Sequence, residues 1–119
     1  MENQYREALD RARREGKLVL VDFTGYACTN CHWMKANMFT RPEIEAALKQ
    51  VVVVDLYTDG TDAESEKNQR FEDSRFQTVS IPFYALMDAN DQVIATFPQL
   101  TRNSQEFLAF LESKPKSGA

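Results

Sequence analysis

A strongly apolar strand followed at once by two cysteines decides the fold, and it reads Leu18-Val19-Leu20-Val21-Asp22-Phe23-Thr24-Gly25-Tyr26-Ala27-Cys28-Thr29-Asn30-Cys31. The apolar run predicts a buried strand, and Trp33, Met34 and Met38 give the residues after the cysteines one apolar helical face that ends near Phe39. The chain has two cysteines in all. Both thiols therefore belong to the junction between a strand and a helix.

The spacing of Cys28 and Cys31 predicts redox chemistry. Two thiols three residues apart at the first turn of a helix can close a small ring, and the free N–H groups of that turn favour the thiolate of the first one. A structural disulfide stabilises most when it closes a long loop, and this one would close a very short loop. We expect Cys28 to attack and the more buried Cys31 to resolve the mixed disulfide. The alternative is a coincidence of two unrelated core cysteines.

Asp22 interrupts the apolar strand six residues before Cys28. Burial should raise the pKa of this carboxyl, so that Asp22 can take a proton from Cys31 during exchange. The alternative is that Asp22 faces a polar partner or the wet end of the strand. Asp55 follows the similar run 51–54, and there we expect the exposed C-terminal edge of a strand instead of a catalytic group.

Length and composition limit the classes of function. A chain of 119 residues predicts one domain, residues 1–113, with a flexible polar tail at 114–119. A net charge of −4 with scattered basic residues argues against a nucleic-acid partner, because no basic stripe could neutralise a run of phosphates. The four glycines lie far apart and form no phosphate-binding loop.

The apolar runs at 18–21 and 51–54 are too short to cross a bilayer. The polar N-terminus lacks the apolar region of a signal peptide. The chain as it stands is therefore expected to be cytoplasmic, or to be a domain of a longer exported or membrane-bound protein.

Periodicity, turn residues and capping patterns predict the other elements. The strand at 51–57 is expected to be central, because its continuous apolar residues suggest cover on both faces. The expected order is a helix at 3–15, a strand at 17–23, the helix after the cysteines, a helix restarting at a Thr40–Glu43 capping box, the strand at 51–57, a mostly solvated helix from Thr61 with Phe71 and Phe76 inward, a hairpin of strands at 83–87 and 92–97, and a last helix with Phe107, Leu108, Phe110 and Leu111 inward. This order predicts an α/β, thioredoxin-like fold with a mixed central sheet flanked by helices.

Four stretches carry a resemblance to a known family: Asp22–Cys31, Leu56–Gly60, Ser80–Phe83 and Phe97–Arg102. They resemble the thioredoxin superfamily and, within it, the C-terminal periplasmic thioredoxin-like domain of the thiol:disulfide interchange protein DsbD of Bacteroidetes-like bacteria. Ala27 stands where thioredoxins usually carry Trp, and Thr29-Asn30 replaces Gly-Pro. Both departures leave the redox potential open, because about 30 mV corresponds to 1.4 kcal/mol.

The resemblance implies that Asp22 is the buried acid, Cys28 the nucleophile and Cys31 the resolving thiol. It also implies that Pro82 is a cis proline, although an X-Pro bond is trans by default. The backbone of Ile81 would then face the disulfide and could pair with a substrate chain.

Tyr26, Trp33 and Phe83 could form an apolar collar around the disulfide that receives a partner. More often such aromatic side chains belong to the core.

The same resemblance implies a protein-disulfide reductase that needs no diffusible cofactor and no metal. It would be a monomeric periplasmic domain of a membrane protein. Its partners would be thiol- or disulfide-carrying proteins: a membrane-embedded electron donor domain and periplasmic acceptors, such as those of cytochrome c biogenesis.

Two other classes of function remain open. Cys28-Thr29-Asn30-Cys31-His32 also matches the attachment site of c-type haem, for which Met34 and Met38 lie too close along the chain to be distal ligands, leaving Met87 or Met1. As an ordinary helix residue, His32 would be solvated, whereas as a cation beside Cys28 it could further lower the pKa of that thiol. Zinc would lack a fourth ligand. The third class is a thioredoxin-fold binding module whose disulfide never turns over.

Overall fold

The computed structural model describes residues 3–114, so the predicted tail from residue 115 on, and Met1 among the haem ligands, lie outside the described residues. The elements in chain order are α1 (Tyr5–Glu15), β1 (Leu18–Thr24), α2 (Thr29–Trp33), a π-helical turn η1 (Met34–Met38), α3 (Pro42–Leu48), β2 (Val51–Tyr57), α4 (Ala63–Phe76), β3 (Phe83–Met87), β4 (Val93–Phe97) and α5 (Ser104–Leu111).

Within residues 3–114, four strands form one sheet in the order β2-β1-β3-β4. β1 is parallel to β2 and antiparallel to β3, and β3 and β4 form the predicted hairpin. This mixed sheet between helices confirms the thioredoxin-like fold class. The central position predicted for 51–57 is wrong, because β2 is an edge strand whose side chains alternate between buried and half-buried.

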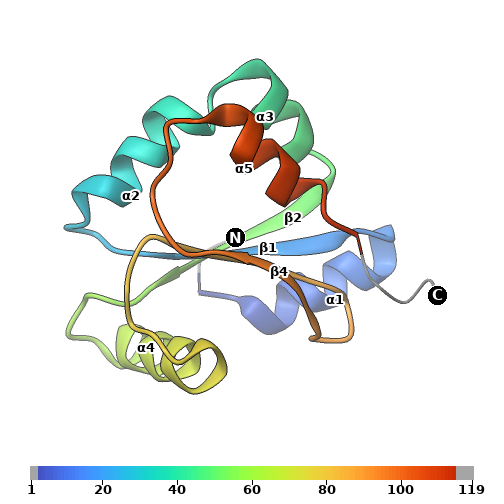
Figure 1. Cartoon of the computed structure of the whole chain (residues 1–119). Helices are drawn as coiled ribbons and strands as arrows, with labels where there is room; N and C mark the ends of the chain where they lie inside the picture. Colours follow the sequence, from blue (N-terminus) through green and yellow to red (C-terminus); the bar gives the residue numbers. More distant parts are fainter. Residues whose placement is uncertain (1–2, 115–119) are drawn as a thin grey trace.

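Helices cover both faces of the sheet (Figure 1): α2, α3 and α5 lie on one face, and α1 and α4 on the other. The alternation of β1 divides its side chains between two cores. Val21 and Phe23 join the core under α1 and α4, whereas Leu20 joins Met34 and Met38 under the other helices. Because side chains alternate along a strand, Asp22 lies on the same face as Leu20. The acid therefore lies beneath the helix that carries the cysteines.

The capping box predicted at Thr40–Glu43 is wrong. The Thr40 hydroxyl instead donates to the Ala36 carbonyl, 2.9 Å away in the preceding helix. Arg41 is the N-cap of α3, without a side-chain cap, and Pro42 occupies the first turn. A proline there has the right φ for a helix and needs no N–H partner, so the helix can begin without the box.

The charged helix α4 buries more polar side chains than the sequence suggested. Phe71 and Phe76 are half-buried and pack against the core under α1 and α4, as predicted. Three polar residues of the same helix are fully buried, however: Ser65, Asn68 and Glu72. The prediction that this helix is mostly solvated is therefore wrong for the face that carries these three residues. None of the helices within residues 3–114 has the length and apolar character needed to span a membrane.

Candidate active site

The two cysteines are joined in a disulfide at the start of α2, with an S–S distance of 2.21 Å. Cys28 is the N-cap of the helix and half-exposed, whereas Cys31 is only 2% exposed. The Cys31 N–H donates to Cys28 Sγ at 3.2 Å. A donor aimed at this sulfur stabilises negative charge on it, so the accessible sulfur is also the better leaving group and nucleophile.

The loop between β1 and the cysteines is held by Asp59, which lies in the turn after β2. Asp59 Oδ1 accepts from the Tyr26 N–H at 2.9 Å and Oδ2 from the Ala27 N–H at 3.0 Å. A Cβ on Gly25 would lie 2.6 Å from Asp59 Oδ2 and 2.8 Å from Ile81 Cδ1. Glycine at this position therefore lets Asp59 and Ile81 approach the backbone before Cys28.

His32 holds the same loop from the helix side. Its Nε2 lies 2.7 Å from the Tyr26 carbonyl oxygen. Because a carbonyl only accepts, Nε2 must carry the hydrogen. The side chain is exposed, as expected of a solvated residue, yet it is also bonded. Covalent haem would require reduction of the disulfide and loss of the Nε2 hydrogen bond to Tyr26, so the local geometry does not favour it.

No group of three or more His, Cys, Asp or Glu side chains within residues 3–114 could hold a metal ion.

Asp22 is buried beneath α2, with 1% exposure. Its Oδ1 has no hydrogen-bond partner in the described part of the chain. Burial raises the pKa of Asp22 well above its usual range, and the charge of Asp55 raises it further. The expected burial and its effect on the pKa are thus present. Of the two alternatives, the wet strand end is absent, whereas a polar neighbour, Asp55, is present. The catalytic role of Asp22 stays a prediction.

Asp55 and Lys35 flank Asp22 as an ion pair, with Lys35 Nζ 3.0 Å from Asp55 Oδ2. The expectation that Asp55 marks an exposed strand edge is wrong, because it lies inside β2 and its side chain is 21% exposed. Burial lowers the pKa of Lys35, but the hydrogen bond and charge of Asp55 outweigh this, so the pKa is raised. The missed sequence signal was the spacing of Lys35 four residues after Cys31, which puts both on one helix face.

The two loops that the resemblance singled out meet at Gly25, three residues before Cys28, where Ile81 approaches the backbone. The Ile81–Pro82 peptide bond is cis, as that resemblance implies. Pro82 is buried and Ile81 half-buried. Tyr26 is 57% exposed and stacks on the Tyr57 ring at 4.1 Å between centroids. Val79, in the loop before Pro82, is also exposed.

Two other aromatic residues of the expected collar lie elsewhere. Phe83 is buried in the core under α1 and α4. Trp33 is half-buried, and the Arg102 guanidinium lies over its ring at 5.0 Å. Tyr26 is thus the collar residue with the large exposed ring.

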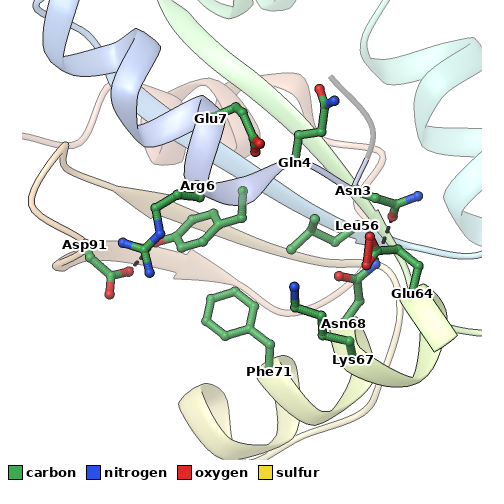
Figure 2. A pocket seen from close by; sticks show the side chains of 11 residues that line it. Asn3, Gln4, Arg6, Glu7, Leu56, Glu64, Lys67, Asn68, Phe71 and Asp91 are labelled. Atoms are coloured by element: carbon green, nitrogen blue, oxygen red, sulfur yellow. Dashed lines mark hydrogen bonds between the residues drawn. The ribbon is translucent and has the colours of Figure 1, made fainter.

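A hollow of about 560 Å³ lies away from the sulfurs, between the start of α1 and helix α4 (Figure 2). Two pairs of its polar side chains are hydrogen-bonded: Asn68 Nδ2 donates to Asn3 Oδ1 at 2.8 Å, and the Tyr5 hydroxyl donates to Asp91. Neither cysteine lines it. The hollow is therefore separate from the disulfide.

Residues 1–89 match a family model described as thioredoxin-like. The chain belongs to the thioredoxin-like family. Solved structures of similar fold include a thioredoxin from Thermus thermophilus, with a TM-score of 0.72 and 22% identity over 90% of this chain and 80% of that one.

Two other structures resemble this thioredoxin-like chain at 18% identity. The C-terminal domain of Neisseria meningitidis DsbD in the reduced form has a TM-score of 0.71 over 94% of this chain and 97% of that one. A DsbH oxidoreductase has a TM-score of 0.70 over 88% and 76%. Among curated protein sequences, none matches. The chain is thus a thioredoxin-fold protein with a Cys-x-x-Cys pair, a combination consistent with thiol:disulfide oxidoreductase activity.

Proposed function

We propose that the protein is a protein-disulfide reductase that passes two electrons from the Cys28–Cys31 dithiol to disulfides of partner proteins. The observation that carries the proposal is the asymmetry of the two sulfurs. Cys28 is accessible at the helix N-terminus and accepts an N–H, whereas Cys31 is buried one turn further on. An accessible attacking sulfur and a sheltered resolving sulfur are what sequential thiol–disulfide exchange requires.

The reaction begins when the Cys28 thiolate attacks a partner disulfide. A mixed disulfide forms, the partner bond breaks, and the first partner sulfur leaves as a thiolate. Cys31 then gives its proton to the Asp22 carboxylate, and the Cys31 sulfur attacks Cys28 Sγ. The internal disulfide forms and the second partner thiolate leaves. The partner has gained the two electrons that the dithiol has lost.

Asp22 suits the role of proton acceptor because of its position and its pKa. It lies on the face of β1 beneath the helix that carries Cys31, and burial keeps its pKa raised. An acid–base group works best when its pKa lies near the working pH. A buried aspartate therefore accepts a proton from a thiol more readily than an exposed one would.

The partner would dock on the loops that carry Tyr26 and Ile81. Both loops lie beside Gly25, and Tyr26 presents an exposed ring that needs little ordering on binding. By likeness to the DsbD C-terminal domain, we propose a membrane-embedded electron donor and periplasmic acceptors as the partners, including proteins of cytochrome c biogenesis. The compartment proposed is accordingly the periplasm.

The activity can be tested with the reduced protein and a disulfide-bonded reporter peptide. We expect the wild type to reduce the peptide, Cys28→Ser to be inactive, and Cys31→Ser to stop at a mixed disulfide visible by mass spectrometry. A wild-type dithiol that leaves the peptide oxidised would instead favour a redox-inert binding module.

The direction of electron flow can be tested by equilibration with glutathione. A reductase should have a potential nearer to the roughly −270 mV of thioredoxin than to the roughly −120 mV of a strong oxidant. Quenching by alkylation and separation of the two forms gives this value. A potential at the oxidising end would refute the reductase direction and leave an oxidase or isomerase.

A further inference from the structure

Asp55 places a second carboxylate beside the buried acid. Asp22 on β1 and Asp55 on β2 are partners in the parallel register. Neighbouring strands lie about 4.8 Å apart, and paired residues point to the same face of the sheet. The flanking partners fix that face, because Leu20 belongs to the core under α2, α3 and α5 and the half-buried Val53 packs against it. The two carboxyl groups therefore lie side by side beneath the helix of the cysteines.

The Lys35 side chain extends from the helix that follows the cysteines to the Asp55 carboxylate. Its Nζ lies 3.0 Å from Asp55 Oδ2, and it follows Cys31 by four residues, so both project from one face of the helix. Exposure rises stepwise across the group: Asp22 is 1% exposed, the Asp55 side chain 21% and the Lys35 side chain 31%. A charged pair thus separates the buried acid from solvent.

We propose that Asp55 and Lys35 are a positioning pair that sets the pH at which Asp22 accepts and releases the proton of Cys31. The inference rests on the proposed function and deepens it. In the resolving step, the proton moves from Cys31 to the Asp22 carboxylate as the internal disulfide forms. Asp22 then returns to the carboxylate by releasing that proton to solvent, while Lys35 stays charged throughout.

The two members of the pair act on Asp22 in opposite directions. The negative charge of Asp55 disfavours a second negative charge next to it, and the ammonium of Lys35 favours one. The pKa of Asp22 follows this rule: burial raises it most, Asp55 raises it further, and Lys35 lowers it. Asp22 without the pair would respond to burial alone.

The other titratable groups around Asp22 are Tyr84, its register partner on β3, and Cys31 on α2. Burial and the two aspartates raise the pKa of Tyr84, so this phenol stays neutral. Tyr57 lies under Lys35, with Nζ 5.5 Å from its ring centroid. The charged neighbours that face Asp22 in the described chain are therefore Asp55 and Lys35.

Because Asp55 and Lys35 shift the pKa of Asp22 in opposite directions, substituting each of them tests the proposal. Two midpoints are measured: that of the acid side of the pH profile of the resolving rate, and that of the carbon-13 NMR titration of Asp22. Both should move down by about one pH unit in Asp55→Asn and up by about as much in Lys35→Met. Asp55→Glu keeps the charge and should restore near-wild-type midpoints. Matched controls are Asp10→Asn and Lys49→Met, exposed residues away from the site that should leave both curves in place.

The NMR titration separates this inference from the proposed function, because it uses the oxidised protein and needs no substrate. Opposite shifts in the two variants support the pair even if the wild type reduces no disulfide, which would refute only the proposed function. If the two variants titrate like the wild type, or move in the same direction, the pair does not set the Asp22 proton. Asp22→Asn assigns the signal.

Discussion

Two buried carboxyls on opposite faces of the sheet differ in their surroundings. Asp22 lies under α2, and Glu72 lies in α4 on the other side. Both are almost inaccessible, and burial raises the pKa of both. In the described chain, one oxygen of Asp22 and both oxygens of Glu72 have no hydrogen-bond partner. Asp22 has a neighbouring ion pair and lies beneath the cysteines. For Glu72, the charge of Asp73 adds to the effect of burial and raises the pKa further. Burial alone perturbs an acid, and position decides whether the perturbation serves chemistry.

The largest expected effect is a difference between Asp22 and Glu72 in how their substitution changes the rate of disulfide reduction. Asp22→Asn should slow reduction of a disulfide peptide about 100-fold near pH 7, the range for loss of a general acid–base group. Glu72→Gln should stay within about twofold of the wild type, because it removes a carboxyl that has no part in the proposed reaction. Stopped-flow kinetics on both reduced variants measures this. Equal losses in the two variants would abolish the distinction.

A second prediction concerns stability and pH at Glu72. Its folded pKa is about 8, whereas an unfolded glutamate ionises at about 4.3. The folded state thus binds the extra proton between these values, so wild-type stability is full below the lower value and is lost as pH rises through the upper one. Glu72→Gln should remove this loss, gaining about 2.5 kcal/mol at pH 7 relative to pH 5, because each pKa unit corresponds to about 1.4 kcal/mol.

Urea denaturation of the oxidised protein at the two pH values measures that gain. Glu66→Gln is the matched control, since Glu66 is an exposed glutamate of the same helix α4. A gain of the same size at pH 5 would mean that better packing, and not the missing charge, stabilises the variant.

Asp59 extends the comparison to an exposed carboxylate whose two oxygens are both bonded. Asp59→Ala should release the Tyr26 and Ala27 amides and cost about 1 kcal/mol of stability, because water can replace part of each bond. Hydrogen exchange at these two amides should accelerate, while the amides of β1 should not change. Unchanged protection would show that the loop does not depend on this side chain.

The smallest effect is expected at the surface. Tyr26→Ala should weaken binding of a protein substrate about fivefold, equivalent to about 1 kcal/mol, the lower end for a tyrosine at an interface centre. A small aromatic disulfide reacts without using the collar, so its rate should be unaffected. KM measured for both substrates gives the contrast. Equal changes for the two would mean that Tyr26 acts on Cys28 itself and not on docking.

Much of the architecture followed from patterns of adjacent residues. The alternation and apolar runs predicted the strands, and the spacing of Phe107, Phe110 and Leu111 predicted the last helix, because such periods fix which face is buried. Errors arose where a local pattern had a competitor. The Thr40 hydroxyl donates to the Ala36 carbonyl instead of capping α3, and α3 begins at Pro42 without a side-chain cap. The valines of β2 suggested a central strand, but an edge strand can bury alternate side chains just as well.

By itself, the sequence determined the pair of cysteines, the strand before them and the acid within that strand, since all three lie within fourteen consecutive residues. Only the tertiary structure decided which distant residues join them. The parallel register brought Asp55 beside Asp22, the helix placed Lys35 over both, and the turn after β2 turned Asp59 onto the loop before Cys28. Such partners come from separate elements, and electrostatic coupling depends on separation in space, which sequence spacing does not give.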